Sequence, residues 1–502
     1  MRVRSKQALS CGCGMLALCT LSTVARADKP FLLIPNSLVI SSSRYDRTQG
    51  ALASLAVGST LPNTDTATTA AIASNNYVDV WNNDNADGSF GLTSAIELTD
   101  VEPHSGFVFG ATQVPADQVV TSFSSKSELA LHFSKDWRGP HIVFVGYAGA
   151  GVGAIDVSAS DAVPGQDPTN PVTFAFGNSY AFARTIVSMD FLGRFSYTPT
   201  IDYGGDNGRA ALLGLDGLYY AVGNSNNGNA ATFAGNGTNP NVTETTGLEV
   251  VTPIDAATSS VAIPAGNSAE VDPLLQFTFG TKPDKAGKDD NFRGLTEFGG
   301  AVYVIKGSGS NGIDTVYTVG SLPTVSDAAS ETLSIVPGFP TDPAKETGAN
   351  FTPFAIFFAN PTTVYVTDEG TGNSLDASSH AGLEKWSLVD GVWQLDYVLM
   401  AGLIGVVDSS LTGVDGPYPA VTTIGLRNLT GVVEGDHVTL WATTSTSSAS
   451  GDNGADPNKV VEITDRLDAT TLTGDVAAES FQVLAPATYG KVYRGVAFAD
   501  LF

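Results

Sequence analysis

The sequence predicts an all-β fold, because it is built from tandem units of short strands and turns. One unit runs from Lys288 to Val319, and a near copy lies upstream. In both copies an Asp-Asn pair precedes an arginine by the same distance, and an Asn-Gly pair follows equally far behind (Asp206-Asn207, Arg209 and Asn227-Gly228; Asp290-Asn291, Arg293 and Asn311-Gly312). The chain also ends in a copy of the strand that opens a unit, Tyr493–Phe498. These observations predict a β-propeller of six blades, with seven as the alternative.

The first predicted strand lies within Asn36–Asp46 and has the apolar centre Leu38–Ile40. This strand lacks a predecessor, and the terminal strand Tyr493–Phe498 lacks a successor. We therefore expect the first strand, Leu38–Ser42, to pair with the last one. Such pairing closes the ring and removes two sheet edges.

The next units are less regular. Ala51–Asn76 is rich in Ala, Thr and Ser, and we expect a loop or an irregular outer layer. Ser127–Phe133 and His141–Tyr147 read as two strands joined by a turn. Two outer strands are expected within Ala181–Tyr197.

The later units follow the same plan. Outer strands are expected near Leu248–Thr252 and Leu274–Phe279 behind Arg209, and near Leu333–Val336 behind Arg293. Six units are counted from their opening residues (Lys126, Arg209, Arg293, Phe354, Arg427 and Arg494). A seventh blade would require residues 75–110 to form a sheet of their own. An open pair of β-sandwiches or a β-helix is the competing architecture.

Residues 1–27 are predicted to be a signal peptide. A basic start is followed by an apolar run, Ala8–Val24, and Ala25-Arg26-Ala27 fits the small-residue cleavage rule. A membrane anchor is the alternative, but the apolar run is short for one; Leu16–Cys19 is a faint lipoprotein motif. We expect an exported protein, secreted or periplasmic, in which residues 28–502 form a single propeller domain with insertions at 51–76, 224–241 and 445–458.

The charge and the cysteines restrict partners and chemistry. The formal net charge is −26, and cleavage removes four basic residues (Arg2, Arg4, Lys6 and Arg26), which leaves about −30. Nucleic acid and anionic membranes are poor partners for such a surface, whereas cations, neutral sugars and basic proteins are better ones. The alternative is that the acidity only keeps the protein soluble. All three cysteines lie in the signal peptide, so the mature chain, expected to be a monomer, has no thiolate or disulfide chemistry (Cys11, Cys13 and Cys19).

Three short motifs resemble the NHL-type and lactonase-like six-bladed β-propellers. They are the Arg-Gly-Leu/Val strand, the Val-Tyr-Val strand and the loop Thr367–Asn373. The resemblance covers most of the mature chain and implies the propeller fold. It does not imply a single function, since such propellers include hydrolases, lyases and binding proteins. The chain departs from these families in its insertions and in lacking catalytic carboxylates at matched positions.

The repeated arginines are the main candidate ligand-binding residues. In a propeller of this topology they would ring one opening of the channel, with two loop asparagines above them (Arg209, Arg293, Arg427, Arg494, Asn227 and Asn311). Guanidinium forks suit an anionic ligand. The competing interpretation is structural: each arginine pairs with an aspartate of the neighbouring blade, such as Asp206 or Asp290. Repetition favours this second interpretation, because a scaffold needs the same bond in every blade.

A Ca²⁺ loop is the candidate metal site. Asn83, Asn85 and Asp87 place oxygen atoms at alternate positions ahead of Gly88, which is what a hard cation needs. Ser94 stands where a Ca²⁺ loop normally has a glutamate. An Asn-rich turn is the alternative, and Ca²⁺ is the only cofactor expected.

Catalytic chemistry has less support from the sequence. There is no Gly-x-Ser-x-Gly elbow, and the five histidines are scattered. Asp368 and Glu369 are the candidate metal-holding or catalytic carboxylates, and His380 is the candidate general base.

The leading hypothesis is therefore an exported propeller that binds a small molecule, glycan or protein on its loop-rich face. A Ca²⁺-assisted hydrolase or lactonase at the channel mouth is the alternative, and a structural cell-surface module is a third.

Overall fold

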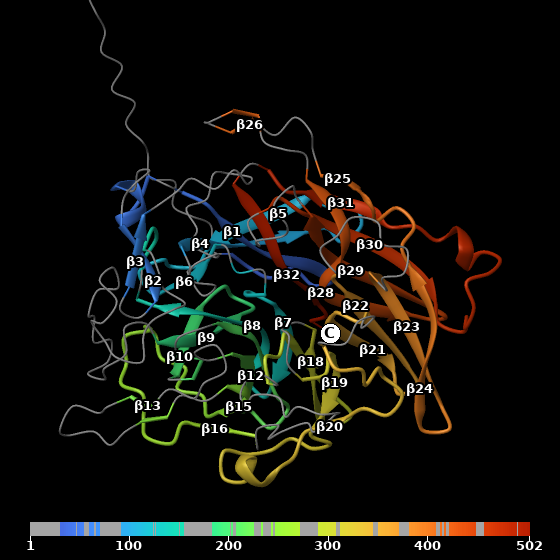
Figure 1. Cartoon of the computed structure of the whole chain (residues 1–502), viewed down its shortest axis with the longest axis horizontal. Helices are drawn as coiled ribbons and strands as arrows, with labels where there is room; N and C mark the ends of the chain where they lie inside the picture. The colour runs from blue at the N-terminus through green and yellow to red at the C-terminus, as the bar shows by residue number, and fades with distance from the viewer. Residues whose placement is uncertain are drawn as a thin grey trace, which may run out of the picture. The chain divides into compact units, whose positions relative to one another are not determined.

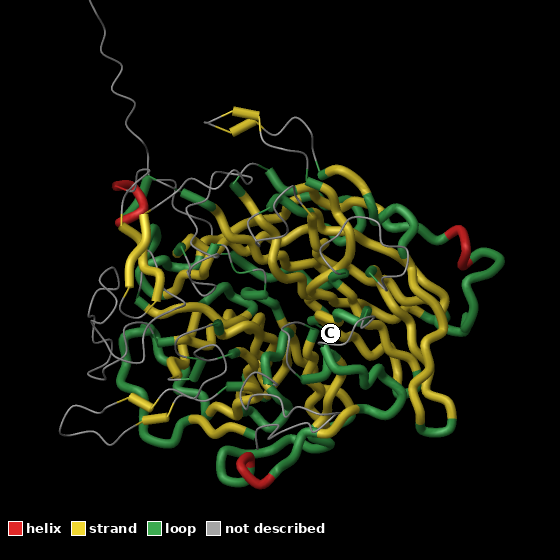
Figure 2. Tube along the Cα trace, in the orientation of Figure 1, coloured by secondary structure: helices red, strands yellow, loops and turns green. Residues whose placement is uncertain are grey.

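A computed structural model describes most of the chain beyond residue 30. The described residues are 31–46, 48–54, 60–64, 67–70, 92–123, 125, 127–149, 151–154, 183–200, 202–203, 207–224, 232–233, 242–243, 246–271, 290–307, 312–344, 350–370, 381–407, 412–413, 416–417, 421–447, 456–488 and 490–501. Within these residues the fold is all-β, and three 3-10 turns are the only helical segments (η1, Ala51–Ser54; η5, Ala328–Ser330; η6, Val476–Ala478; Figure 2). No helix in this part of the chain has the length and apolar character to cross a membrane.

The first sheet brings together both ends of the described chain and has nine strands. Its main path is β10-β9-β8-β6-β4-β1-β32, and β5 and β7 pair with β4 and β8. The strands of this sheet are β1 (Ser37–Arg44), β4 (Thr93–Val101), β5 (Val108–Gln113), β6 (Val119–Ser122), β7 (His132–Asp136), β8 (Gly139–Ala148), β9 (Arg184–Asp190), β10 (Phe195–Thr200) and β32 (Lys491–Ala499). Short β6 joins two groups of four strands, because it pairs with β4 on one side and β8 on the other.

Four further sheets follow in chain order, each with strands in consecutive antiparallel order (Figure 1). The first two of them are β11 (Gly208–Leu213), β12 (Tyr219–Gly223), β15 (Gly247–Val251) and β16 (Ser268–Glu270), and then β17 (Gly294–Phe298), β18 (Ala301–Lys306), β19 (Thr315–Thr318) and β20 (Ser334–Ile335). The third consists of β21 (Pro353–Asn360), β22 (Thr363–Asp368), β23 (Gly382–Val389) and β24 (Val392–Leu399). The fourth consists of β28 (Thr422–Glu434), β29 (His437–Ser447), β30 (Lys459–Arg466) and β31 (Gln482–Pro486), with β25 (Gly405–Val406) added at the edge of β28. Three small hairpins lie outside these sheets: β2 (Thr60–Thr64) with β3 (Ala67–Ala70), β13 (Thr232–Phe233) with β14 (Val242–Thr243), and β26 (Thr412–Gly413) with β27 (Gly416–Pro417).

The repeated Val-Tyr-Val motif forms the second strand of two sheets. In β22 every residue from Thr363 to Asp368 is buried. A strand reads as a continuous apolar run when neighbours cover both of its faces. The motif therefore marks strands that are packed between two adjacent sheets.

Each pair of consecutive sheets shares its own hydrophobic cluster. Residues of β8 and β9 pack on β11 and β12, those of β11 and β12 on β17 and β18, and those of β18 and β19 on β22 and β23. The fourth cluster joins β22 and β23 to β29 and β30. Trp441 of β29 then stacks on Phe498 of β32, with ring centroids 5.1 Å apart, so the last sheet packs on the sheet that holds β1. Burying apolar surface between sheets is the main stabilising term of such a fold.

The predicted pairing of the first and last strands is confirmed. β1 and β32 are antiparallel, with Leu38 opposite Phe498 and Val39 opposite Ala497. The register shifts between Ile40 and Ser42. The other neighbour of β1 is β4, so β4 and β5 belong to this sheet instead of forming a sheet from residues 75–110 alone.

Several local predictions differ from the structure. Residues 51–76 contain the turn η1 and the β2–β3 hairpin, where a loop or irregular layer was expected. The strand expected at Ser127–Phe133 begins only at His132, since the preceding residues turn inward and Leu129 has a positive φ of 60°. The strand expected at Leu274–Phe279 lies outside the described residues.

Candidate functional site

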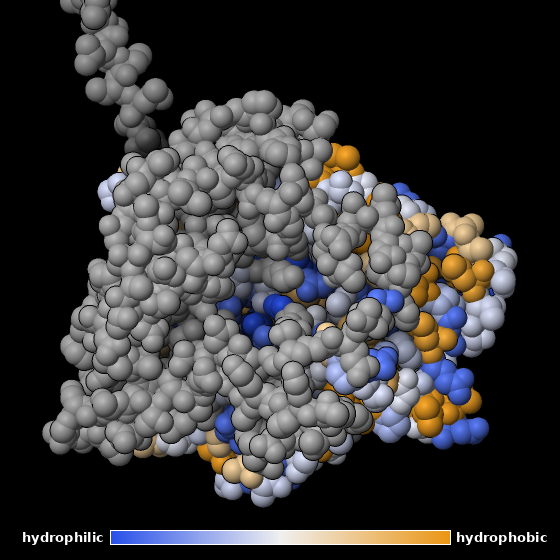
Figure 3. Space-filling model, viewed as in Figure 1, coloured by the Kyte–Doolittle hydropathy of each residue, from blue (hydrophilic) through white to orange (hydrophobic). Residues whose placement is uncertain are grey.

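The four repeated arginines occupy matching places in the fold. Arg209 lies in β11, Arg427 in β28 and Arg494 in β32, whereas Arg293 immediately precedes β17. All four side chains are buried. We call them the arginine layer. Figure 3 shows hydrophilic residues in the hollow at the middle of the displayed face.

Arg209 reaches into the segment that precedes β17, and Arg494 reaches into the segment that precedes β7. Arg209 donates to the side chain of Asn291 and to the carbonyl of Phe292, the latter at 3.0 Å. Arg494 donates to the carbonyls of Phe123 and Ser125. The Arg209 contact joins two neighbouring sheets, and the Arg494 contact joins β32 to the segment between β6 and β7 of its own nine-stranded sheet. Asp206 lies outside the described residues.

Arg427 makes a different contact, with the preceding sheet. Its Nε donates to Glu369 at 3.1 Å, and both side chains are nearly inaccessible to solvent. The ring of Phe354, which takes the arginine's place in β21, lies 5.9 Å from the guanidinium of Arg427 and 6.0 Å from that of Arg293. Cations at this distance from an aromatic ring are attracted by its quadrupole.

Burial and mutual repulsion shape the electrostatics of the layer. Burial lowers the pKa of Arg427. The negative charge of Glu369 opposes this shift, and the positive charge of Arg293 adds to it. Burial, together with the charge of Arg427, lowers the pKa of Arg494 to about 9, against the attraction of Glu128. The arginines are thus close enough to repel one another. Such cations are stable only because carbonyls and carboxylates surround them.

Glu128 is a buried member of the same region that the sequence did not single out. It accepts hydrogen bonds from the Tyr147 hydroxyl, from Thr121 Oγ1 at 2.8 Å and from the Ser122 amide at 2.9 Å. Burial raises the pKa of its carboxyl. The sequence feature that could have identified it is a single glutamate within the apolar strand pattern Ser127–Phe133.

The two candidate catalytic carboxylates hold the chain together locally. Asp368 is fully buried and accepts hydrogen bonds from the amide and hydroxyl of Thr352 and from the Gly370 amide. Burial raises its pKa, while those hydrogen bonds lower it. Glu369 is the partner of Arg427, and its carbonyl accepts from Ser445 at 2.6 Å. Both carboxylates are therefore engaged by protein groups.

The remaining predicted site residues lie outside the described residues: His380, Asn227, Asn311, Asn83, Asn85 and Asp87. Ser94 is buried in β4. Among the described residues, no group of three or more histidine, aspartate or glutamate side chains is placed to hold a metal ion.

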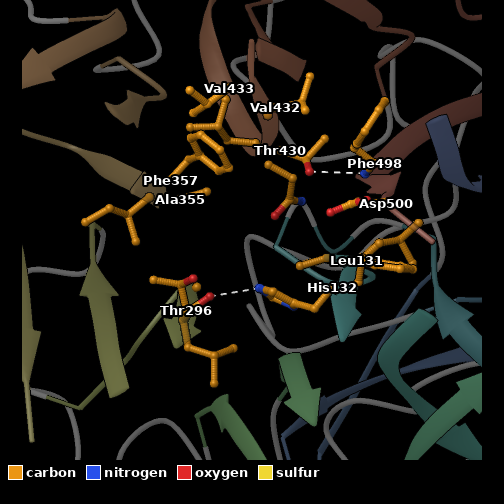
Figure 4. Close-up of a pocket in the computed structure, with 18 residues that line it drawn as sticks. Leu131, His132, Thr296, Ala355, Phe357, Thr430, Val432, Val433, Phe498 and Asp500 are labelled. Carbon is orange, nitrogen blue, oxygen red and sulfur yellow. Dashed lines mark hydrogen bonds between the residues drawn. The ribbon is translucent and has the colours of Figure 1, made fainter. Parts of the chain in front are cut away.

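A cavity of about 420 Å³ lies beside the arginine layer (Figure 4). Its lining comes from β7, β17, β21, β28 and β32, starting one residue beyond Arg293 and Arg427 and reaching Val433 and Asp500. The histidine in its wall, His132, donates from Nε2 to the carbonyl of Leu295 at 2.8 Å. The sequence did not predict this cavity, because each lining segment taken alone has the pattern of an ordinary strand and the cavity forms only where several strands meet.

Comparison with known proteins gives no family assignment. No family model matches the chain, and no curated protein matches it. Among solved structures, the Bombyx mori GH32 beta-fructofuranosidase BmSUC1 is 11% identical, with a TM-score of 0.29 over 72% of this chain and 64% of that one. This chain therefore spans less than two thirds of the length of that enzyme. A quinoprotein alcohol dehydrogenase-like protein of Bacteroides thetaiotaomicron is 8% identical, with a TM-score of 0.29 over 82% and 85% of the two chains. An S. cerevisiae complex that contains Dbp5, Nup159 and Gle1 gives 8% identity and a TM-score of 0.24.

Proposed function

We propose that the mature chain is an exported, closed six-bladed β-propeller that binds a ligand or protein partner on the face where its first strands begin. The six blades would be β32-β1-β4-β5, β7-β8-β9-β10, β11-β12-β15-β16, β17-β18-β19-β20, β21-β22-β23-β24 and β28-β29-β30-β31. Ring closure is supported by contacts between the first strands, which run from β7 through β11, β17, β21, β28 and β32 back to β7. A hydrophobic cluster at each of the six junctions supports it as well.

The interlocked arginine layer is the observation that carries the binding proposal. Arg209 and Arg494 bond to the segments that enter the next proposed blades, and Arg427 bonds to Glu369 of the preceding one. These contacts fix the starting ends of the first strands relative to each other. Binding residues are commonly carried by loops on such a rigid scaffold, and the insertions 224–241 and 445–458 would be those loops here.

Binding is favoured over hydrolysis because Asp368 already accepts three hydrogen bonds from Thr352 and Gly370. A catalytic carboxylate instead needs a free oxygen toward a metal, water or substrate. Asp368→Asn should therefore lower stability through its lost hydrogen bonds. Loss of a measurable lactonase or esterase activity in a variant that still folds would favour the alternative, a Ca²⁺-assisted hydrolase.

The binding face can be tested with an array of neutral glycans, the ligand class that suits an acidic surface. The mature chain is compared with a variant in which residues 225–241 are replaced by a short Gly-Ser linker. The control is Leu472→Ser, an exposed substitution in the segment after β30. We expect glycan retention that the linker variant loses and the control keeps. Retention that survives in the linker variant would contradict the use of this insertion, and no retention at all would contradict a neutral glycan as the ligand.

A further inference from the structure

The strand β5 has an open edge. Among the described residues its only strand partner is β4. Apart from that pairing, the backbone of Val108–Gln113 forms no backbone hydrogen bond within the part of the chain that the structure describes. An open edge presents a row of N–H and C=O groups, to which another extended chain can pair.

The last strands of the five other proposed blades are protected against such pairing. β16 and β20 have only three and two residues. β10 contains Pro199, and β31 contains Pro486. β24 carries Asp396, and its Trp393 amide donates to the carbonyl of Pro337 at 2.9 Å. Short length, proline, charge and a covering segment are the means by which proteins block pairing at a sheet edge.

β5 uses none of these protections. It has six residues, and none of them is charged or a proline. Phe109, Ala111 and Gln113 alternate along one exposed side of the strand. Phe107, just before the strand, is 67% exposed, and its ring packs edge-on against Phe109 with centroids 5.9 Å apart. An added strand would therefore find two exposed aromatic rings for an apolar side chain of its own.

The turn that leads into β5 is acidic. Glu102 closes this turn, since its amide donates to the carbonyl of Phe107 at 2.8 Å. His104 forms a hydrogen bond with Glu462 at 2.8 Å, which, together with the charges of Glu462, Glu102 and Glu434, raises the pKa of His104. Three carboxylates thus surround one imidazole, in a chain of net charge −26. A cationic side chain is attracted to such a region, whereas a second copy of the acidic chain is repelled.

We propose that the open edge of β5 binds an extended peptide segment of a basic protein as an added strand. Backbone hydrogen bonds to β5 hold the segment, an apolar side chain packs on Phe107 and Phe109, and a lysine or arginine lies near Glu102. In strand addition the main chain supplies affinity and alternate side chains supply specificity. This site uses a last strand, whereas the binding face proposed above uses loops beside the first strands, so neither proposal depends on the other.

The test is fluorescence polarisation with a labelled peptide of about eight residues, an ordinary strand length, in which valine and lysine alternate. The mature chain is titrated at about 0.15 M salt, which screens long-range attraction. One comparison peptide has glutamate in place of lysine, and another has proline in place of every second valine, which removes donors from the ladder. We expect saturable binding of the valine–lysine peptide at one site per chain, and about tenfold or more weaker binding of both comparison peptides.

Two variants of β5 and two matched controls locate the binding. Phe109→Ser and Ala111→Lys should each weaken binding of the valine–lysine peptide about tenfold or more. Leu395→Ser and Gln394→Lys make the equivalent changes on β24 and should leave binding unchanged. All four positions are exposed, so the fold should tolerate the substitutions, and an unchanged melting temperature checks this.

Three results would overturn the proposal. The first is an absence of saturable binding. The second is equal binding of the proline peptide, since the attraction is then only electrostatic. The third is binding by the β5 variants that equals that of their controls. A chain that sediments as a dimer, and that Ala111→Lys converts to a monomer, would make a second copy the occupant and would overturn the basic peptide as well.

Discussion

At the residue scale, Arg209, Arg427 and Arg494 form hydrogen bonds with protein groups of other strands and loops. The spacing of Arg209 and Arg293 behind Asp-Asn pairs indicated a role that recurs in each unit. In the structure Arg209 donates to the carbonyl of Phe292 ahead of β17, and Arg494 donates to carbonyls between β6 and β7. A carbonyl acceptor has no sequence signature, so sequence patterns alone could not identify these partners.

Arg494→Gln tests how much the hydrogen bonds of Arg494 contribute to stability. The substitution removes charge-assisted hydrogen bonds to Phe123, Ser125 and Ser43 and leaves buried carbonyls unpaired. We expect the free energy of unfolding to fall by about 3 kcal/mol, measured by urea denaturation. Arg194→Gln is the control, because Arg194 is 73% exposed in its pair with Asp190 and should contribute less than about 1 kcal/mol. Equal losses in the two variants would contradict the structural role of Arg494.

At the element scale, buried polar networks connect strands of different sheets. Asp465 of β30 accepts from Lys385 of β23 at 2.9 Å and from the Tyr397 hydroxyl of β24 at 2.7 Å, and the charged pair is fully buried. Sequence patterns did not reveal this pair, because 80 residues separate its members (465 − 385) and each looks like an isolated charge in a strand. The pairing of β1 with β32 was predictable, since both strands lacked a partner within their own unit.

The Asp465 network should make stability depend on pH. Burial, together with Asp465, raises the pKa of Glu479 from its ordinary value to about 8. Between pH 4.5 and 8 the folded chain therefore binds more protons at this group than the unfolded chain, so stability falls as pH rises through that window. We expect Glu479→Gln to raise the melting temperature at pH 8 relative to the parent and to reduce its change between pH 5 and 8.

Glu434→Gln, at the exposed end of β28, is the matched control for the Glu479 experiment. It should leave the pH dependence of the melting temperature as in the parent. If the melting temperature of Glu479→Gln changes with pH as much as that of the parent, Glu479 is not the source of the pH dependence.

The terminal strand should be essential for folding. Ending the chain at Gly490 deletes β32, which leaves one edge of β1 unpaired and removes Phe498 from Trp441. Such an exposed strand edge invites aggregation. We expect loss of a cooperative melt together with increased light scattering. A chain that ends at Asp500 keeps the whole strand and should melt like the parent; a cooperative melt of the shorter chain would show that β32 is dispensable.

At the scale of the whole molecule, a bound Ca²⁺ ion should stabilise the native fold. The loop with Asn83, Asn85 and Asp87 lies outside the described residues, so its Ca²⁺ assignment stays a prediction from the sequence. We expect Ca²⁺ to raise the melting temperature of the EDTA-treated mature chain, because a ligand that binds only the native state stabilises it. Asp87→Ala should abolish the rise, and Asp390→Ala, in the turn between β23 and β24, should keep it. An unchanged melting temperature in the parent would remove Ca²⁺ from the fold.

The sequence by itself determined the all-β class, the tandem units and the pairing of the first strand with the last, because repeats and strand patterns are local properties of the chain. Only the tertiary structure decided which atoms the arginines bond to, that Asp368 is engaged by Thr352 and Gly370, and that five strands enclose a cavity beside His132. The physical reason is distance along the chain. Hydrogen bonds and apolar contacts act over a few ångströms, and the groups around Arg209, Arg494 and the cavity come from segments tens to hundreds of residues apart.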